Sequence, residues 1–210
     1  MIRVLIADDH AIVRHGLRQI LSAESEIETV GEAKTGNEVF DILRDVKVDA
    51  LVLDITMPGR NGLETLKEVR RLYPNIGVVV LSMHPKDQYA VRVLKAGASA
   101  YISKESAPDE LVHAIRSAYH GRKYITSDVA ELLAEYVQHG SSPDPHYSLS
   151  DRELEVFSMI AVGKGLTQIA EELRLSVKTV STYKSRIAEK TGLSTSSDIT
   201  RYYLEHGLNK

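Results

Sequence analysis

The chain has 210 residues, of which 43% are hydrophobic and 26% charged, and its formal net charge is −3. This length suits two ordinary domains, and the composition is that of a globular protein. It contains no cysteine, which excludes disulfides, thiolate nucleophiles and cysteine-ligated metals. Because no apolar run reaches the roughly 20 residues of a membrane span and no signal peptide is visible, we expect a cytoplasmic protein.

Short apolar runs alternate with amphipathic segments over the first 121 residues. The apolar runs predict strands at 3–7, 27–31, 50–54, 78–82 and 100–104. A helical pattern follows each of them. Five strands that each precede a helix predict an α/β fold with a doubly wound parallel sheet, and continuous apolar strands indicate a sheet covered on both faces.

Local signals predict where several helices begin and end. Thr35-Gly-Asn-Glu38 is a capping box that opens the second helix, and Pro108 suits the first turn of the fifth. Gly97 and Gly121 suit helix C-termini. The residues expected on the core side of the first helix are Ile12, Leu17, Ile20 and Leu21.

The last third of the chain is predicted to be helical. A helix at 128–138 leads into HGSSPDPHYS (139–148), a stretch of turn-forming residues that we read as the interdomain linker. A second capping box, Ser150-Asp-Arg-Glu153, opens the next helix. Further helices are expected at 167–175, 176–192 and 196–207. The predicted domains are therefore 1–121 and 148–210, joined by a linker helix and flexible linker at 122–147.

Charged and hydroxyl side chains stand at the ends of four predicted strands. Asp8 and Asp9 follow the first, Asp54 ends the third, Ser82 the fourth and Lys104 the fifth. Each alone fits a solvated turn, but carboxyl ends of parallel strands share one edge, where open α/β sheets bind ligands. Three carboxylates there favour a hard cation such as Mg²⁺. With a lysine and a hydroxyl, such a site suits transfer of a phosphoryl group to an aspartate.

The stretches around these residues resemble the receiver domain of two-component response regulators. They are Asp8-Asp9, LDITMPGRNGLE around Asp54, VVVLS ending at Ser82 and GASAYISK ending at Lys104. The resemblance implies a flavodoxin-like, five-stranded receiver. Glu105 departs from it, because many receivers carry proline after this lysine, and the local backbone geometry is left open.

The resemblance also implies roles for these residues. Asp54 would be the phosphoacceptor, and Lys104 would contact the phosphoryl group. Ser82 and Tyr101 would form a switch pair, in which Ser82 moves toward the phosphoryl group and Tyr101 follows it inward. The implied Mg²⁺ ligands are Asp8, Asp9, Asp54 and the backbone carbonyl of Thr56.

The segment 176–190 reads as an amphipathic basic helix. Between Arg174 and Lys190 there are five cations and a single carboxylate. Val180, Tyr183 and Ile187 form the side expected to pack on the preceding helix. A solvated helix has the same pattern, but a short helix joined to it at 174–176 favours a helix-turn-helix. The predicted DNA-contacting residues are Lys178, Thr179, Ser181, Thr182, Lys184, Ser185 and Arg186.

The stretch from Tyr147 to Leu193 is similar to the LuxR-type helix-turn-helix, so the whole chain resembles response regulators of the NarL/FixJ family. This resemblance implies a transcription regulator with a sensor histidine kinase, double-stranded DNA, RNA polymerase and a second copy of the chain as partners. The last helix would pair the DNA-binding units. Ile199, Tyr202, Tyr203 and His206 are candidates for that face, and a core role for Ile199 and Tyr203 is an equal alternative.

Parts of the sequence also fit other functions. An aspartate-nucleophile phosphatase would need a second acid two residues after Asp54, where Thr56 stands. A DNA-binding regulator that works without phosphorylation remains an alternative. GEAKTGN (31–37) lacks the Lys-Ser/Thr of a phosphate-binding loop. The eight histidines, His113 and His120 included, show no metal-ligand spacing and are expected at the surface or facing a partner.

Overall fold

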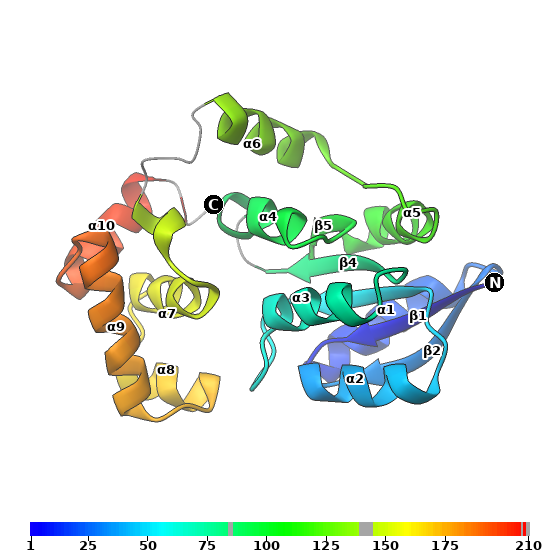
Figure 1. The fold of residues 1–210 in the computed structure, drawn as a ribbon, viewed down its shortest axis with the longest axis horizontal. Coiled ribbons are helices and arrows are strands. Elements are labelled where there is room, and N and C mark those ends of the chain that lie inside the picture. The colour runs from blue at the N-terminus through cyan, green and yellow to red at the C-terminus, as the bar shows by residue number, and fades with distance from the viewer. Residues whose placement is uncertain (84–85, 139–144, 207, 209–210) are drawn as a thin grey trace. The chain divides into compact units, whose positions relative to one another are not determined.

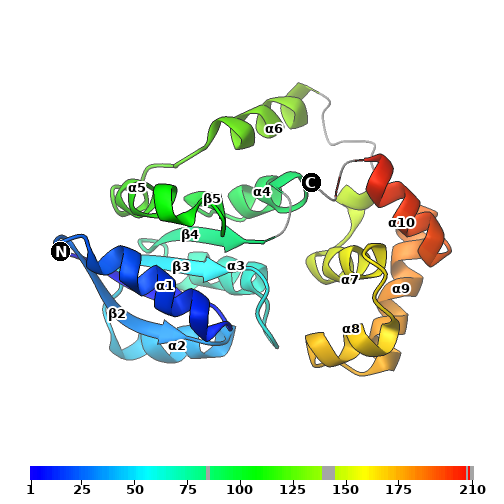
Figure 2. The ribbon, with the colours of Figure 1, turned by 180° about the vertical axis from the view of Figure 1, so that it is seen from behind.

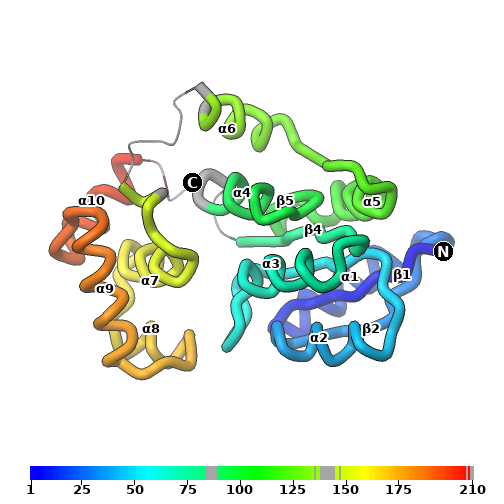
Figure 3. The backbone as a smooth tube through the Cα atoms, in the orientation of Figure 1, coloured from blue at the N-terminus to red at the C-terminus, as the bar shows by residue number. Residues whose placement is uncertain are grey.

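The structure, a computed structural model, describes residues 1–83, 86–138, 145–206 and 208 (Figure 1). By its internal contacts the chain divides into two units, Met1–Leu133 and Ala134–Lys210. The boundary lies inside a helix, Ser127–Gln138 (α6). Figure 3 traces the backbone of both units.

The first unit contains a five-stranded parallel sheet in the order β2-β1-β3-β4-β5. Its strands are Ile2–Ala7 (β1), Ile27–Ala33 (β2), Ala50–Asp54 (β3), Gly77–Ser82 (β4) and Ala100–Ser103 (β5). The doubly wound sheet predicted from the sequence is confirmed. The strand order changes direction between β1 and β3, which is where such sheets place their ligands.

Helices cover both faces of this sheet. They are Ala11–Ser22 (α1), Gly36–Asp45 (α2), Gly62–Leu72 (α3), Lys86–Lys95 (α4) and Ala107–Tyr119 (α5). α1 and α5 lie together on one face, which Figure 2 shows in front. They enclose a core with alternate residues of the strands, such as Val4, Ile6 and Val52. The central strands are therefore buried on both sides, as their continuous apolar sequences predicted.

Two expectations for the helix patterns need correction. Ile12 is 83% exposed, and Val13 packs against the core in its place, beside the buried Leu17 and Leu21. The capping box at Thr35 is half formed, because Thr35 accepts from the N–H of Glu38, whereas the Glu38 carboxylate accepts from the N–H of Lys34.

The segment after α5 extends the sheet edge. The N–H of Tyr124 donates to the carbonyl of Ser99 at 2.9 Å, and Tyr124 forms an isolated parallel bridge with Ala100. The first turns of α6 also belong to this unit, and Val129 is buried there. The beginning of the predicted 122–147 linker is thus attached to the sheet.

The second unit is a compact set of helices. They are the 3₁₀ helix Pro145–Ser148 (η1) and the α-helices Asp151–Ala161 (α7), Leu166–Leu173 (α8), Val177–Thr191 (α9) and Ser196–Glu205 (α10). The capping box of Ser150 and Glu153 at the start of α7 is complete, as predicted. None of the helices in the described part of the chain has the length and apolar character of a membrane-spanning segment.

The end of the predicted linker is folded into this unit. Residues 139–144 lie outside the described residues, but 145–148 form η1, and His146 is buried. Its Nδ1 lies 2.9 Å from the hydroxyl of Tyr202 on α10. The expectation that the histidines lie at the surface is therefore wrong for His146.

Candidate functional site

Four strand ends meet at the carboxyl edge of the sheet. Because β1 lies beside β3, Asp8 directly after β1 is next to Asp54 at the end of β3. Because β4 pairs with β5, the N–H of Lys104 donates to the carbonyl of Ser82 at 2.9 Å. The structure thus brings these predicted site residues together at the switch point of the sheet.

Lys104 lies between two buried carboxylates. Its Nζ is 2.7 Å from Oδ2 of Asp8 and 2.9 Å from Oδ2 of Asp54. Both aspartates are 1% exposed, and the Lys104 side chain is 10% exposed. These are contacts between charges rather than aligned hydrogen bonds, and neither oxygen has a hydrogen-bond partner among the described residues. One ammonium therefore faces two carboxylates, which leaves negative charge uncompensated.

This arrangement shifts the pKa values of the two partners. Burial raises the pKa of Asp54 to about 6, against the opposing attraction of Lys104 and with a further rise from Asp8. Burial lowers the pKa of Lys104, but its interactions with Asp54 and Asp8 outweigh that effect and the net pKa is raised. At neutral pH Asp54 is therefore mostly ionised, in a place that penalises its charge.

The loop after β3 holds Asp54 from the backbone side. The N–H of Thr56 donates to Oδ1 of Asp54 at 3.1 Å. Gly62, at the start of α3, sits so close that an added Cβ would lie 2.1 Å from the Asp54 carbonyl oxygen. Only a glycine permits this close approach, so Gly62 fixes the position of the Asp54 backbone relative to α3.

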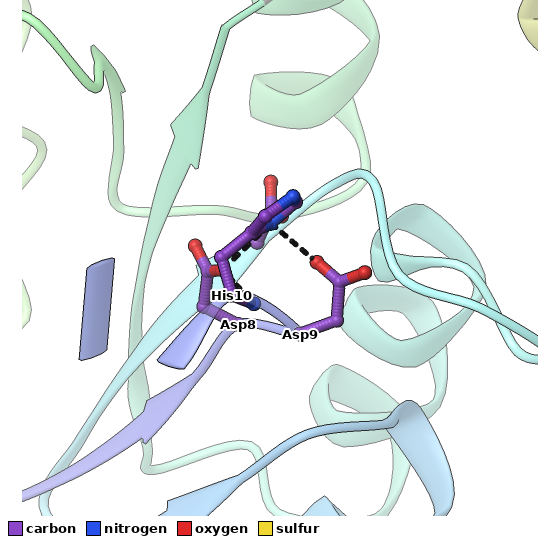
Figure 4. A group of neighbouring side chains, drawn as sticks. Asp8, Asp9 and His10 are labelled. Atoms are coloured by element: carbon purple, nitrogen blue, oxygen red, sulfur yellow. Dashed lines mark hydrogen bonds and ion pairs between the residues drawn. The ribbon is translucent and has the colours of Figure 1, made fainter. Parts of the chain in front are cut away.

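The remaining acid, Asp9, lies with a histidine that the sequence analysis did not assign to the site. Figure 4 shows Asp8, Asp9 and His10 close together. Nδ1 of His10 is 2.7 Å from Oδ1 of Asp9 and 3.4 Å from Oδ1 of Asp8. His10 directly follows the two aspartates in the sequence, and that position at a strand end was the signal available for finding it.

The donor set fits a divalent cation. Asp8, Asp9, His10 and Asp54 each offer a ligand atom, and these atoms lie within 4.8 Å of one another. Oδ2 of Asp8 and Oδ2 of Asp54 share the single ammonium of Lys104, so a bound cation would compensate the negative charge that Lys104 leaves on these carboxylates. Carboxylate oxygens are the ligands preferred by Mg²⁺. The backbone carbonyl of Thr56 as a further ligand stays a prediction.

The predicted switch pair lies close to this cluster in the sheet. Ser82 is fully buried, and Tyr101 is 1% exposed. The Tyr101 ring thus already lies inside the fold in this conformation, and its role as the switch partner of Ser82 stays a prediction.

In the second unit, α8 and α9 form a helix-turn-helix. The turn passes through Arg174, which adopts a left-handed conformation with φ 53°. Val180 and Ile187 of α9 are buried with Ile169 and Leu173 of α8, as predicted. On the other side of α9, most of the predicted DNA-contacting side chains are exposed: Lys178, Ser181, Thr182, Ser185 and Arg186. This leaves one polar, basic face of α9 open to solvent.

The other two predicted contacts are partly buried. Thr179 is half-buried, and its hydroxyl lies 2.7 Å from that of Ser176 at the helix N-cap. Lys184 is half-buried, and its Nζ donates to Oγ of Ser196 on α10 at 3.2 Å. Of the candidate pairing residues on α10, Ile199, Tyr202 and Tyr203 are buried, so the core alternative is confirmed for Ile199 and Tyr203. His206 is exposed.

Comparison with known proteins assigns both units to families. The response regulator receiver domain matches residues 4–116, and the luxR family of bacterial regulatory proteins matches residues 147–203. Response regulator UvrY from Escherichia coli (strain K12) is 38% identical over 209 residues, which cover 99% of this chain and 96% of UvrY.

Solved structures of RcsB resemble the whole chain. RcsB from Salmonella enterica serovar Typhimurium, bound to promoter rprA in the presence of the phosphomimetic BeF3−, has a TM-score of 0.68 and 29% identity, and the match covers 100% of this chain and 98% of RcsB. A structure of two RcsB dimers bound to two parallel DNAs has a TM-score of 0.61 and 28% identity. That match covers 97% of this chain and 98% of RcsB. The chain belongs to the response regulators of two-component systems, in the NarL/FixJ family, with a receiver domain followed by a LuxR-type helix-turn-helix DNA-binding domain.

Proposed function

We propose that this response regulator accepts a phosphoryl group on Asp54 from a sensor histidine kinase and then binds promoter DNA as a dimer through α9. The observation that carries the proposal is the Asp54 carboxylate, which is buried beside Asp8 with its Oδ2 2.9 Å from Nζ of Lys104. A buried, ionised carboxylate with a neighbouring ammonium suits a nucleophile that receives an anionic group.

The transfer balances as a single displacement. An Asp54 carboxylate oxygen forms a bond to phosphorus, the bond from phosphorus to the kinase histidine nitrogen breaks, and that nitrogen keeps the electron pair and takes a proton. Lys104, 2.9 Å from Oδ2 of Asp54, is placed to pair with the phosphoryl oxygens. The N–H of Thr56 holds Oδ1 of Asp54 during the attack.

Asp8, Asp9 and Asp54 are the residues proposed to hold Mg²⁺, with the Thr56 carbonyl as a further ligand. The cation would neutralise negative charge on the incoming phosphoryl group. An aspartate-nucleophile phosphatase is less well supported, because Thr56 has no proton donor suited to a leaving group. The chain's own residues thus favour acceptance of the phosphoryl group over its rapid hydrolysis.

The exposed face of α9 is proposed to enter the major groove. Lys178 and Arg186 supply cations for phosphates, and Ser181, Thr182 and Ser185 supply hydroxyls for base edges. The hydroxyl of Thr182 donates to the Lys178 carbonyl at 3.0 Å, and that of Ser185 to the Ser181 carbonyl at 3.2 Å. Their free lone pairs can still accept from amino groups of bases.

The dimer is supported by the relatives. The RcsB structures are bound to DNA, one with a phosphomimetic and another as two dimers. A dimer on DNA places two α9 helices on two half-sites. At a promoter, RNA polymerase is the proposed further partner.

The test combines phosphorylation with DNA binding in the full-length protein. With Mg²⁺ and acetyl phosphate, we expect the intact mass to rise by one phosphoryl group and binding to promoter DNA to strengthen. Asp54→Asn should show neither change, because an amide is a poor nucleophile. Asp45→Asn, at the exposed end of α2, is the matched control and should behave like the wild type.

Two results would contradict the proposal. Labelling of Asp54→Asn to the wild-type extent would move the acceptor to another residue. Labelling of the wild type with no change in DNA affinity would favour the regulator that works without phosphorylation.

A further inference from the structure

The main chain of Asp8 is held on both sides by hydrogen bonds. Its N–H donates to the carbonyl of Ala33 on β2 at 3.1 Å. Its carbonyl accepts from Nη1 of Arg14 on α1 at 2.8 Å, in a contact that is buried. The peptide that joins Asp8 to Asp9 therefore has its oxygen held by a side chain, not by the sheet.

Arg14 is an unusual residue for its place in α1. Its side chain is 7% exposed, on the face of the helix that packs into the fold. Burying a guanidinium costs several kcal/mol unless its donors are paired. Glu32 on β2 supplies the counter-charge, with Oε2 3.1 Å from Nε of Arg14. An apolar residue would fill this position at a lower cost, so packing does not explain an arginine here.

We infer that Arg14 is a positioning residue for the cation site, acting through the Asp8 carbonyl with Glu32 as its support; this rests on the proposed function. By fixing the 8–9 peptide, Arg14 sets the directions in which both neighbouring carboxylates leave the chain. Residues that orient metal ligands in this way affect metal affinity without touching the metal.

The contacts of Asp8 show why its orientation matters. Oδ1 of Asp8 accepts from the N–H of His10 at 2.8 Å, while Oδ2 faces Lys104 at 2.7 Å. Because the Asp8 backbone is held by Ala33 and Arg14, Oδ1 of Asp8 stays directed at the N–H of His10 and Oδ2 stays directed at Lys104. Rotation of the 8–9 peptide would turn Asp9 away from this cluster.

Arg18 offers a matched control one turn further along α1. It bonds to the same Glu32, through Nη1 and Oε1 at 3.0 Å. Its side chain is 50% exposed, and its contacts are with Glu32 and with Nδ1 of His15. Removing Arg18 takes away the same charge and the same ion-pair partner, but leaves the Asp8 carbonyl bonded.

The experiment measures Mg²⁺ binding to the unphosphorylated full-length protein by isothermal titration calorimetry. We expect Arg14→Met to weaken Mg²⁺ binding about tenfold, and Arg18→Met to leave it within about twofold of the wild type. With acetyl phosphate as donor, the Mg²⁺ concentration for half-maximal labelling should rise by the same factor in Arg14→Met, while the rate at saturating Mg²⁺ is kept.

Equal Mg²⁺ affinities of Arg14→Met and the wild type would overturn the inference, as would an equal loss in Arg18→Met. If Arg14→Met does not fold, Glu32→Gln is the variant to measure. We expect it to bind Mg²⁺ about threefold more weakly, and an unchanged Mg²⁺ affinity would overturn the positioning role of Arg14. If the wild type accepts the phosphoryl group and binds Mg²⁺, and Arg14→Met binds Mg²⁺ equally well, only the positioning role is refuted. A wild type that binds no Mg²⁺ refutes the proposed cation site as well.

Discussion

Asp54 carries a charge in a position that works against the stability of the fold. Its side chain is buried, and the single ammonium beside it is shared with Asp8. The resulting rise of its pKa, from 3.8 to about 6, means that the folded protein holds this proton more tightly than the unfolded chain does. In the proposed function this charge is required, because an ionised carboxylate is the nucleophile.

This predicts a pH-dependent stability difference for Asp54→Asn in the absence of Mg²⁺. A raised folded-state pKa makes the wild type lose stability as pH rises from 3.8 to about 6, with no further loss above that range. The neutral variant avoids this loss. Near pH 8 with EDTA, urea unfolding should show Asp54→Asn more stable by up to about 3 kcal/mol, and near pH 4 the difference should be small.

The exposed variant Asp45→Asn serves as the reference, with changes of no more than about 0.5 kcal/mol across the range. A stability gain for Asp54→Asn that is the same near pH 4 and near pH 8 would mean that its cause is not the Asp54 charge.

Single residues differ in how far the sequence predicts them. Asp8, Asp54, Ser82 and Lys104 could be placed because residues at the ends of parallel strands share an edge by geometry. The ion pairs of Lys104 with both acids could not be predicted, because they depend on how its side chain packs. Tyr101 shows the same limit, since a strand pattern does not tell whether an aromatic ring lies inside or outside in one conformational state.

At the scale of elements, α9 carries a packing side and, opposite it, the side proposed to contact DNA. Its sequence pattern separates an apolar side from a polar side, and the structure confirms that separation for Val180 and Ile187. Lys184 sits between the sides, half-buried and bonded to Ser196 of α10. Lys178 is exposed at the N-terminal end of the helix. The two lysines therefore differ in exposure, and the Lys184 ammonium is bonded to another helix of the same unit.

This difference predicts different effects on DNA binding. Lys178→Gln should weaken binding to all DNA sequences alike and lower the slope of log K against log salt by about one. Lys184→Gln should lower it by less, because its ammonium already has a partner in α10. Fluorescence anisotropy across a salt series measures both slopes, and a larger change for Lys184→Gln would contradict this division.

The errors at the level of elements have a common cause. Helix positions followed from periodicity, but the side of α1 that faces the core was misjudged at Ile12, because α1 places Val13 inward and the buried Arg14 nearby. Likewise, the proline and serines near 145 indicated a linker, whereas His146 finds a buried partner in Tyr202. Local composition does not record such long-range pairs.

At the scale of the whole molecule, the two units are joined by a chain whose ends are both anchored. Tyr124 bonds to the sheet edge on one side, and His146 bonds to α10 on the other. If phosphorylated receivers pair, each dimer carries two DNA-binding units on one assembly. The second unit then meets its half-site at an effective concentration near the millimolar range.

The alternative mechanism is that the receiver covers α9 until phosphorylation releases it. The two mechanisms differ in what the isolated DNA-binding unit does. That unit should be taken from Pro145 rather than from Tyr147, because starting at Tyr147 removes His146 and leaves the buried Tyr202 hydroxyl without this bond, at a cost of about 1 kcal/mol or more.

We expect tethered pairing, in which the fragment 145–210 binds a two-half-site promoter more weakly than the phosphorylated full-length protein and no more tightly than the unphosphorylated one. The physical reason is that the fragment lacks the receiver that raises the local concentration of the second unit. Fluorescence anisotropy at one salt concentration compares the three proteins, and a DNA with a single half-site is the control, on which the phosphorylated protein should lose most of its advantage. A fragment that binds clearly more tightly than the unphosphorylated full-length protein would show that the receiver inhibits α9, and covering would replace pairing as the mechanism.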